Sequence, residues 1–388
     1  MNQMDSRSGK TAAQPGSYLA FFPNPLPPHP PLNLDDDALL TLSAADRAVG
    51  ALSTFGDLIP SANLFVAMYV RREAVLSSEI EGIACTLEDV LKYEEAEERS
   101  KVEETPDVAQ VVNYVRAFNA GIEHLREQPF SLELIRTLHK ILLADSPRGD
   151  DRAGNFREDQ NWIGPKGSTL TTAHYVPPPV DHMRMSLGNF EYYVRDKRDM
   201  PLLVRCALVH AQFETIHPFS DGNGRIGRLL VPLMLAAEGA LRHPLLYLSL
   251  YLLENRAEYY ERLMAVRRAG DWEGWLKFFL TGVRITADDA MQRSKTILGL
   301  YEDVMRKAAA LRRSAIPIAE TLFAHPIITT QGARKHTGLA FDTARQALEL
   351  LATAGIVKEI TGQRRGRIYV FDRYIQILRD SWASPRVA

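Results

Sequence analysis

The chain has 388 residues, of which 46% are hydrophobic and 24% are charged. This composition excludes a disordered, collagen-like or mucin-like chain, and the length predicts two or three domains of roughly 150 residues each. Lys and Arg total 46 against 48 for Asp and Glu, a formal charge of -2, which argues against a protein that coats nucleic acid along its whole length. The two cysteines, Cys85 and Cys206, are too few for a disulfide framework and lack the spacing of a zinc ribbon, so they favour a reducing compartment.

The first ten residues lack the apolar core of a signal peptide, and the longest apolar run, 229–237, is too short to cross a bilayer. We therefore expect a cytoplasmic protein with no membrane partner. Prolines cluster between residues 23 and 31, so we expect residues 1 to about 32 to form an irregular, extended arm.

Helical patterns dominate the chain after this arm, which predicts a mainly α fold. They cover about 36–55, 61–81, 84–98, 107–125, 131–143, 181–195, 199–216, 223–238, 254–268 and 271–310. One long segment, 155–179, is not helical: two arms with aromatic, aliphatic and threonine residues flank the turn sequence GPKGS, which predicts a β-hairpin. These residues are Phe156, Trp162 and Ile163 in the first arm and Thr169, Leu170, Thr171 and Tyr175 in the second. A free edge of such a hairpin can accept an extended segment of a partner protein.

The strongest chemical signal is HPFSDGNGRIGR at residues 217–228, between an apolar helix that ends near Ile216 and another that begins near Asn223. Gly222 and Gly224 allow a close approach of the backbone, and free N–H groups at a helix start attract anions. This pattern predicts a phosphate-binding turn. It is neither a Walker A loop nor a Rossmann fingerprint, because the GxxxxGK[ST] pattern is absent and no strand precedes it.

The charged residues of this motif suit chemistry on phosphates. Arg225 and Arg228 are three positions apart, on neighbouring positions of one helix face, where they could hold different phosphates of one chain. Asp221 suits a magnesium ion that phosphate oxygens also coordinate, and His217 suits a general base. Taken singly, a histidine before proline is usually structural and a Gly-Asn-Gly sequence is usually only a turn. The occurrence of a histidine, a carboxylate, two glycines and two arginines within twelve residues is what favours a phosphate-binding catalytic site.

HPFSDGNGRIGR resembles the complete HPFx[D/E]GNGRxxR signature of the Fic family of protein adenylyltransferases. The resemblance implies a Fic-type helical core with a β-hairpin flap at 155–179, and transfer of AMP from ATP to a Ser, Thr or Tyr hydroxyl of a protein, with pyrophosphate leaving. By matching position, His217 would deprotonate the hydroxyl, Asp221 would hold Mg2+, Asn223 with the backbone of Gly222, Gly224 and Arg225 would surround the phosphates, and Arg228 would bind the γ-phosphate.

A second stretch, Ser77 to Gly82, matches the family's inhibitory motif [S/T]xxxE[G/N]. Ser77 and Glu81 are four apart on one helical face, and Gly82 is a natural helix end. A carboxylate in the last turn opposes the helix dipole, so Glu81 needs a cation from elsewhere. The resemblance names Arg228 as that cation and implies that the pair prevents productive ATP binding.

The adenine pocket is less well defined by the sequence. Family members place residues that follow the catalytic helix around the base, and here the candidates are Tyr251, Glu254, Asn255 and Tyr259. Each of them could equally serve only to pack a helix.

The C-terminal part reads as a different module. Two short helical patterns, a third at 341–354 and two strand segments predict a winged helix-turn-helix. From residue 311 onward, 12 Lys and Arg stand against 6 Asp and Glu, an excess of +6, which permits DNA binding. The third helix offers only Thr343, Arg345 and Gln346 for reading bases, whereas Asp342 and Glu349 repel phosphate. This favours a protein-docking or dimerisation role over DNA binding.

The sequence thus predicts three parts: an N-terminal arm and helices with the inhibitory motif (1–106), a catalytic core (107–310) and a winged helix-turn-helix domain (311–388). The predicted function is an autoinhibited, homodimeric protein adenylyltransferase that uses ATP and Mg2+ and modifies itself and a target protein docked along the flap. The alternative is a nucleotide-sensing, DNA-binding transcriptional regulator. Covalent transfer of label from ATP to protein distinguishes the two.

Overall fold

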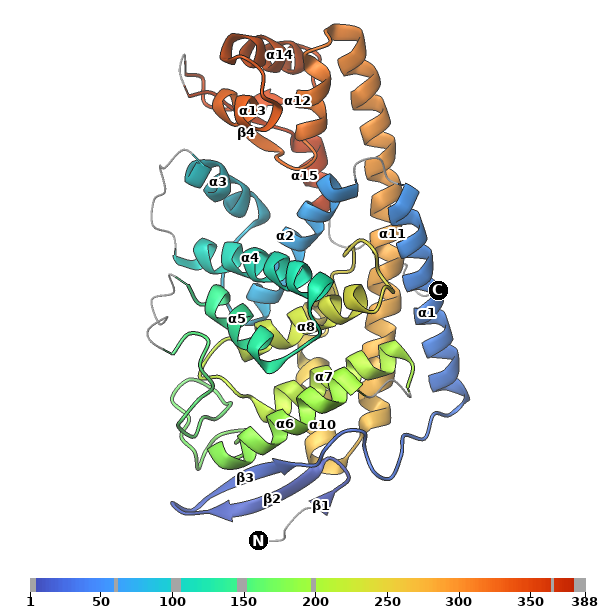
Figure 1. Ribbon diagram of the computed structural model, residues 1–388, viewed down its shortest axis with the longest axis vertical. Coiled ribbons are helices and arrows are strands. Elements are labelled where there is room, and N and C mark those ends of the chain that lie inside the picture. Colours follow the sequence, from blue (N-terminus) through green and yellow to red (C-terminus); the bar gives the residue numbers. More distant parts are fainter. Residues whose placement is uncertain are drawn as a thin grey trace.

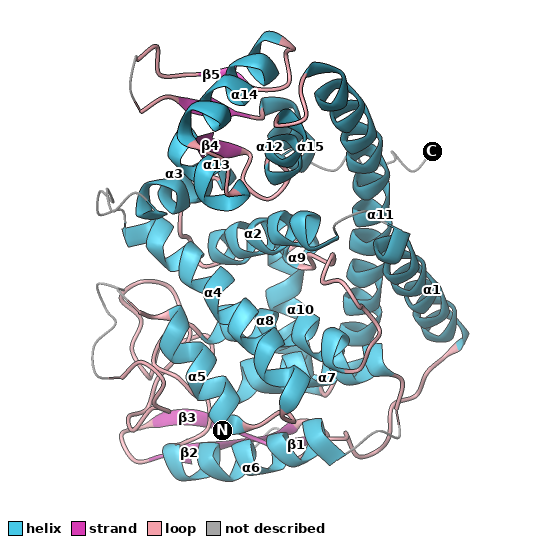
Figure 2. Ribbon diagram, turned by 45° about the horizontal axis from the view of Figure 1, so that its top comes forward, coloured by secondary structure: helices cyan, strands magenta, loops and turns pink. Residues whose placement is uncertain are grey.

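The computed structural model describes residues 5–58, 62–98, 106–144, 152–196, 200–363 and 366–379. This part of the chain is mainly helical, as predicted, with a small antiparallel sheet at each end of the molecule (Figures 1 and 2). The helices up to residue 311 are α1 (Asp36–Leu58), α2 (Ala62–Ile80), α3 (Leu87–Glu98), α4 (Pro106–Glu127), α5 (Leu132–Leu142), α6 (Val180–Asp196), α7 (Leu202–Ile216), α8 (Asn223–Ala237), α9 (Ser249–Glu254), α10 (Arg256–Ala269) and α11 (Trp272–Leu311). Among the described helices, none combines the length and the apolar character needed to cross a bilayer.

The core is centred on α7, whose residues from Leu203 to Ile216 are all buried. Such a helix is apolar all round because other elements cover every face. Helix α8 packs against α7 and α4, and the 40-residue α11 runs along one side of the molecule, where it packs against α1 (Figure 1). The end of α7 and the start of α8, where the phosphate-binding turn was predicted, are therefore held by the most buried elements of the fold.

The expectation of an irregular N-terminal arm is wrong for residues 5–23. They form a three-stranded sheet of β1 (Asp5–Ser6), β2 (Gly9–Gln14) and β3 (Tyr18–Pro23), in the order β1-β2-β3. The proline cluster at 23–31 begins only where β3 ends, while Ala20 and Phe21 supply buried side chains that anchor the strand. Phe21 N donates to Val176 O at 3.0 Å, so this sheet is joined to the predicted flap.

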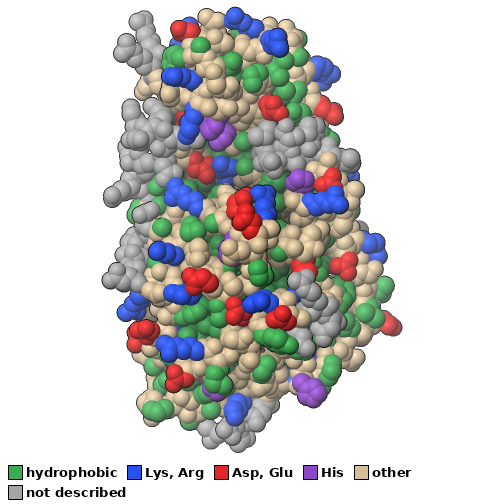
Figure 3. Space-filling model, viewed as in Figure 1, with side chains coloured by type: hydrophobic (Ala, Val, Ile, Leu, Met, Phe, Trp, Pro, Cys, Tyr) green, Lys and Arg blue, Asp and Glu red, His purple; other side chains and the backbone are tan. Residues whose placement is uncertain are grey.

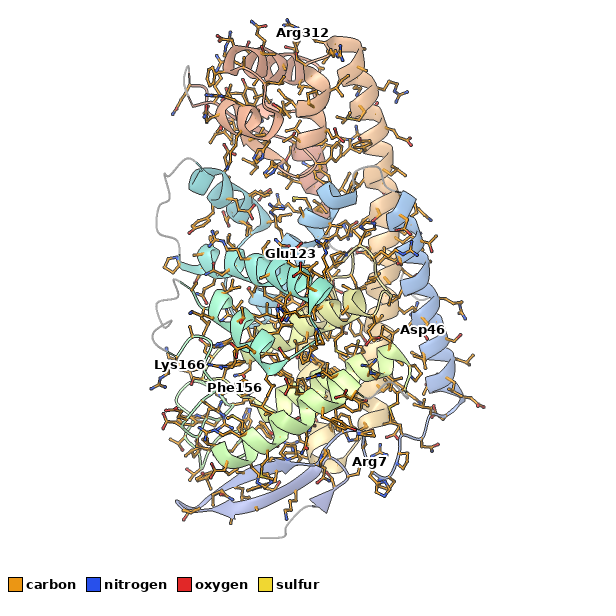
Figure 4. The ribbon with its side chains drawn as sticks, viewed as in Figure 1. Arg7, Asp46, Glu123, Phe156, Lys166 and Arg312 are labelled. Carbon is orange, nitrogen blue, oxygen red and sulfur yellow. The ribbon has the colours of Figure 1, made fainter. Side chains whose placement is uncertain are left out.

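The flap, predicted at 155–179 as a β-hairpin, has one antiparallel bridge, between Ile163 and Tyr175, and otherwise consists of two short turns and irregular backbone. Local hydrogen bonds such as Thr169 N to Thr172 Oγ1 at 2.9 Å satisfy the backbone within each turn, so a longer ladder does not form. Phe156 lies on the inner side of this loop and Lys166 at its outer edge (Figure 4). The ring of Phe156 is 5.1 Å from that of Phe219.

The C-terminal part contains the predicted helices and strands and two elements that the sequence reading missed, β4 and α15. Its elements are α12 (Ala315–Thr321), β4 (Ile327–Thr329), α13 (Thr330–Thr337), α14 (Phe341–Thr353), β5 (Lys358–Glu359), β6 (Ile368–Val370) and α15 (Asp372–Arg379), with the sheet order β4-β6-β5. Strand β4 is only three residues long, too short for a periodic signal. Arg364 and Arg365, in the predicted wing, lie outside the described residues.

Candidate active site

His217 ends α7 in a left-handed backbone conformation, with φ 49° and ψ 61°. Residues other than glycine rarely adopt this conformation, and where they do the strain is often associated with a functional site. The next residues turn sharply, and Gly222, with φ 74°, begins α8. The predicted motif therefore connects two buried helices through a tight turn.

Two side chains fix the conformation of this turn. The amide oxygen of Asn223 accepts a hydrogen bond from Phe219 N, and its Nδ2 donates to Phe219 O, both at 2.8 Å. The imidazole of His139 stacks on the ring of Phe219 with centroids 3.7 Å apart. His139 Nδ1 accepts from Gly154 N at 2.9 Å, so Nε2 carries the proton and donates to Asp221 O at 3.0 Å. The side chain of Asn223 is thus engaged with the loop, and the backbone is left to contact phosphates.

The flap also holds the turn from outside. Arg157 Nε donates to His217 O at 3.0 Å, and Arg157 N donates to Pro218 O at 2.9 Å. Asn161 Nδ2 donates to Phe219 O at 2.9 Å. The sequence reading missed His139, Arg157 and Asn161. The polar run 157–161 in the first arm of the predicted hairpin is the one signal that could have indicated Arg157 and Asn161.

The start of α8 offers an anion-binding site. The first amide groups of a helix have no partner within it, and Gly222 provides no side-chain cap. The exposed Asp221 bends back, so that Gly222 N donates to Asp221 Oδ1 at 2.7 Å. A Cβ atom on Gly224 would lie 2.2 Å from Glu81 Oε1. The carboxylate of Glu81, directly after the end of α2, therefore already reaches this helix start, and only glycine at position 224 leaves room for it.

Glu81 and Arg228 form an ion pair, with Arg228 Nη2 2.6 Å from Glu81 Oε1. Arg228 also donates from Nε to Ser77 Oγ and from Nη2 to Ser77 O, both at 2.9 Å. Burial opposes both charges, yet Arg228 lowers the pKa of Glu81 and Glu81 raises the pKa of Arg228. The pair is therefore ionised, and it joins α2 to α8 at the anion-binding site. Gly82, with φ 84°, follows in the left-handed region that ends a helix.

The surroundings of His217 keep its imidazole neutral. Burial and the nearby Arg267 lower the pKa of His217 to about 3. Arg267 Nη2 donates to Glu214 O at 2.9 Å, and its guanidinium lies over the ring of Tyr175, 3.9 Å from the centroid. A neutral imidazole has one ring nitrogen free to accept a proton, as a general base requires.

Arg225 and Arg228 point to different partners. Arg225 is buried and donates from Nη1 to Gln110 Oε1 of α4 at 3.2 Å, whereas Arg228 points to α2. In this arrangement the two arginines do not form one clamp.

Two segments match known family sequences: residues 39–123 match the Fic/DOC family N-terminal region, and residues 129–235 match the Fic/DOC family. The chain carries a Fic/DOC domain. Curated relatives include a probable protein adenylyltransferase from Aquifex aeolicus, 25% identical over 46% of this chain and 51% of the relative, and a protein adenylyltransferase from Caenorhabditis briggsae, 26% identical over 42% of this chain and 29% of the relative. The matches thus cover about half of the first relative's length and less than a third of the second's.

The Fic fold extends beyond the matched segments. The crystal structure of a Fic family protein from Desulfovibrio desulfuricans G20 superimposes with a TM-score of 0.56 at 20% identity, covering 88% of this chain and 97% of that chain. At this identity the likeness concerns the fold alone. The Fic-type helical fold expected from the sequence is confirmed, and residues 129–235 carry the Fic/DOC match that the resemblance predicts.

The Fic domain places the four adenine candidates around the junction of α9 and α10. Asn255 separates α9 from α10; the helix expected at 254–268 is present as α10, and α9 is an additional short helix before it. Asn255 Nδ2 donates to Tyr251 O at 2.9 Å, while Glu254 is exposed. Tyr259 is only 1% exposed. His210 Nδ1 contacts Gly227 O, which can only accept, so Nδ1 carries the proton and Nε2 accepts the hydrogen bond that Tyr259 donates at 2.8 Å. Tyr259 therefore packs in the core, and the other three lie nearer the surface.

A magnesium site in this Fic domain would depend on Asp221. Within the described residues, no group of three or more His, Cys, Asp or Glu side chains could hold a metal ion. Mg2+ commonly binds through one or two carboxylates together with substrate phosphates. The exposed carboxylate of Asp221, next to the free amides of α8, fits that mode of binding.

Proposed function

We propose that this chain is an autoinhibited protein adenylyltransferase, which transfers AMP from ATP to a Ser, Thr or Tyr hydroxyl of a target protein and of itself. One observation carries the proposal: a carboxylate, Glu81, lies at the helix start where the phosphates of a nucleotide would bind, paired with the buried Arg228. The protein adenylyltransferases among the curated relatives support this reaction class.

In the proposed reaction, the neutral imidazole of His217 takes the proton of the acceptor hydroxyl. The hydroxyl oxygen forms a bond to the α-phosphorus of ATP, the bond from that phosphorus to the bridging oxygen breaks, and pyrophosphate leaves. The amides from Gly222 to Arg225 and the guanidinium of Arg228 stabilise the negative charge of the phosphates. Asp221 would hold Mg2+, which neutralises phosphate charge when bound.

Inhibition follows from competition for one cation. Arg228 cannot bind the γ-phosphate fully while it is paired with Glu81, and the carboxylate would repel phosphate at the same helix start. ATP would therefore bind in an unproductive way until α2 withdraws Glu81. The signal that moves α2 would set the activity of the enzyme.

The acceptor protein is proposed to dock along the flap, because Arg157 and Asn161 connect the flap directly to the backbone at His217. For adenine binding, Tyr251, Glu254 and Asn255 are the better candidates, since Tyr259 is enclosed in the core.

For the C-terminal part, beginning near residue 311, we propose protein docking or self-association as a homodimer rather than DNA reading. Arg345 Nη1 and Arg367 Nη1 both pair with Glu349, at 3.0 and 2.9 Å. Two of the arginines that could contact DNA are thus held by one carboxylate within the module. On the face shown in Figure 3, acidic and basic side chains alternate without a large patch of one sign, which gives little support to the alternative of a DNA-binding regulator.

Incubation with ATP labelled at the α-phosphate tests the function. We expect covalent label on the Glu81→Gly protein and none on the Glu81→Gly, His217→Ala double variant. Reversible binding of ATP without covalent label in either protein would contradict the proposal and favour a nucleotide sensor.

A further inference from the structure

Glu214, which the proposed mechanism does not use, lies beside the catalytic candidate His217. It is buried on the last turn of α7, and its Oε2 is 4.0 Å from His217 Nδ1. Neither His217 Nδ1 nor Glu214 Oε1 has a hydrogen-bond partner within the described part of the chain. The backbone oxygen of Glu214, which accepts from Arg267, is another oxygen that faces this ring. Two unpaired buried polar atoms on neighbouring side chains are uncommon and need an explanation.

Helix α8 is shaped to leave room for this carboxyl group. A Cβ atom on Gly227 would lie only 2.6 Å from Glu214 Oε1. Gly227 occupies a variable position of the HPFx[D/E]GNGRxxR signature and contacts no phosphate in the proposed mechanism. Because Gly227 has no side chain, it leaves room for the carboxyl group of Glu214.

The charges around the His217 imidazole explain why a carboxylate is needed beside it. His217 faces two cations, Arg267 from α10 and Arg157 from the flap. Protonation of His217 during the reaction would place a third positive charge beside them. Glu81 also acts on the imidazole, but in the proposed active state it withdraws. Glu214 is then the carboxylate that remains next to the ring.

We propose that Glu214 is a positioning residue for His217: its carboxylate accepts the proton of Nδ1, which leaves Nε2 unprotonated and directed to the acceptor hydroxyl. When Nε2 takes the hydroxyl proton, the Nδ1 proton stays in place and the carboxylate stabilises the imidazolium. A shift of about 1 Å closes the gap to hydrogen-bond distance, in keeping with the longer contacts of catalytic pairs before substrate binds. This inference rests on the proposed transferase function.

The arrangement predicts which group controls the activity as the pH falls. Burial raises the pKa of Glu214 to about 7, with Glu81 acting in the same direction and Arg228 and Arg267 opposing it; Tyr259 of α10 also faces it. The carboxylate form is present above this pKa and is lost as the pH falls through it. A protonated Glu214 would donate to Nδ1 and leave the proton on Nε2, which is the wrong tautomer for a base.

The test compares Glu214→Gln with its parent, both in the Glu81→Gly background, by kcat as a function of pH and by KM for ATP. The parent should lose activity as the pH falls through the pKa of Glu214, which is lower in this background than in the wild type because Glu81 no longer raises it. Glu214→Gln should lose this dependence and have a plateau at least about tenfold lower, with KM for ATP little changed. An unchanged plateau and an unchanged pH dependence would overturn the inference. Gly227→Ala, which displaces the carboxyl group without removing it, should lower the plateau but keep the pH dependence.

A second measurement needs no transferase activity and no variant that must fold. The ¹⁵N chemical shifts of the His217 ring in the wild-type protein should change from the Nδ1–H tautomer at high pH to the Nε2–H tautomer at low pH, with a midpoint in the neutral range. A single tautomer throughout this range would refute the role of Glu214. Absence of AMP transfer in the Glu81→Gly parent would instead refute the proposed function, so the two failures are distinguishable.

Discussion

Replacing Glu81 by glycine should release the proposed transferase activity, and the structure sets the size of the effect. Glu81 contributes one charge-assisted hydrogen bond to Arg228, at 2.6 Å. Such a bond stabilises the closed state by about 1.5–3 kcal/mol. At about 1.4 kcal/mol per factor of ten, the productive fraction should rise by about 10- to 150-fold. The contacts of Arg228 with Ser77 remain and limit the gain.

The assay is the initial rate of self-modification with labelled ATP. Glu79→Gly is the matched control, because Glu79 is exposed in the last turn of α2, two residues before Glu81, and is not an ion-pair partner of Arg228. This substitution lowers helix propensity but removes no contact with Arg228, so the rate should stay within about twofold of the wild type. Arg228→Ala also breaks the pair, but it should abolish transfer because it removes the proposed phosphate ligand. An equal increase in rate from Glu81→Gly and Arg228→Ala would refute the reasoning, because Arg228 would then hold Glu81 in the inhibited state without binding phosphate.

Three further outcomes follow from the structure. His217→Ala in the Glu81→Gly background should lower transfer by about 10²–10⁴-fold, with ATP affinity unchanged by calorimetry; a large loss of affinity would show that His217 acts in binding. Asn223→Ala should lower the free energy of unfolding by about 1–3 kcal/mol, because it leaves the buried backbone N–H of Phe219 unpaired; denaturant titration would contradict this if the midpoint does not move. Deletion of residues 311–388 should yield an unstable, aggregating protein by thermal melt and gel filtration, because it exposes Phe65; a stable monomer with unchanged melting temperature would show that the contact is dispensable.

The last of these outcomes could not be foreseen from the sequence. The change in charge near residue 311 suggests a separable module, yet the structure packs it against α2, which leads into the inhibitory motif, and against α3, which follows it. The rings of Phe65 and Phe323 lie 5.5 Å apart, and Glu95 of α3 accepts a hydrogen bond from Thr329 N at 3.1 Å. Contacts between residues more than two hundred positions apart leave no local pattern in a sequence.

Most helices were predictable because they are long and their apolar residues recur with helical period. The N-terminal sheet was not, because the prolines that follow it dominate the composition of the region while its anchors, Ala20 and Phe21, are few. The three-residue strand β4 has too few residues to show a period.

The candidate site was predictable where its chemistry is contiguous. The motif 217–228 holds the base, the carboxylate and the glycines of the helix start within one turn and one helix. The pairing of Glu81 with Arg228 came from a family resemblance, and nothing local in the sequence connects residues 147 positions apart. Glu214 and Arg157 were missed because their roles depend on burial and on the flap folding back over the turn.

The central claim is transfer of AMP to protein by this Fic domain, and the most direct test uses two labels in parallel. The Glu81→Gly protein is incubated with ATP labelled either at the α-phosphate or at the γ-phosphate, denatured and separated from free nucleotide. The account predicts covalent label from the α-phosphate only, lost when His217→Ala is added. Label from the γ-phosphate, or no covalent label from either, would contradict it.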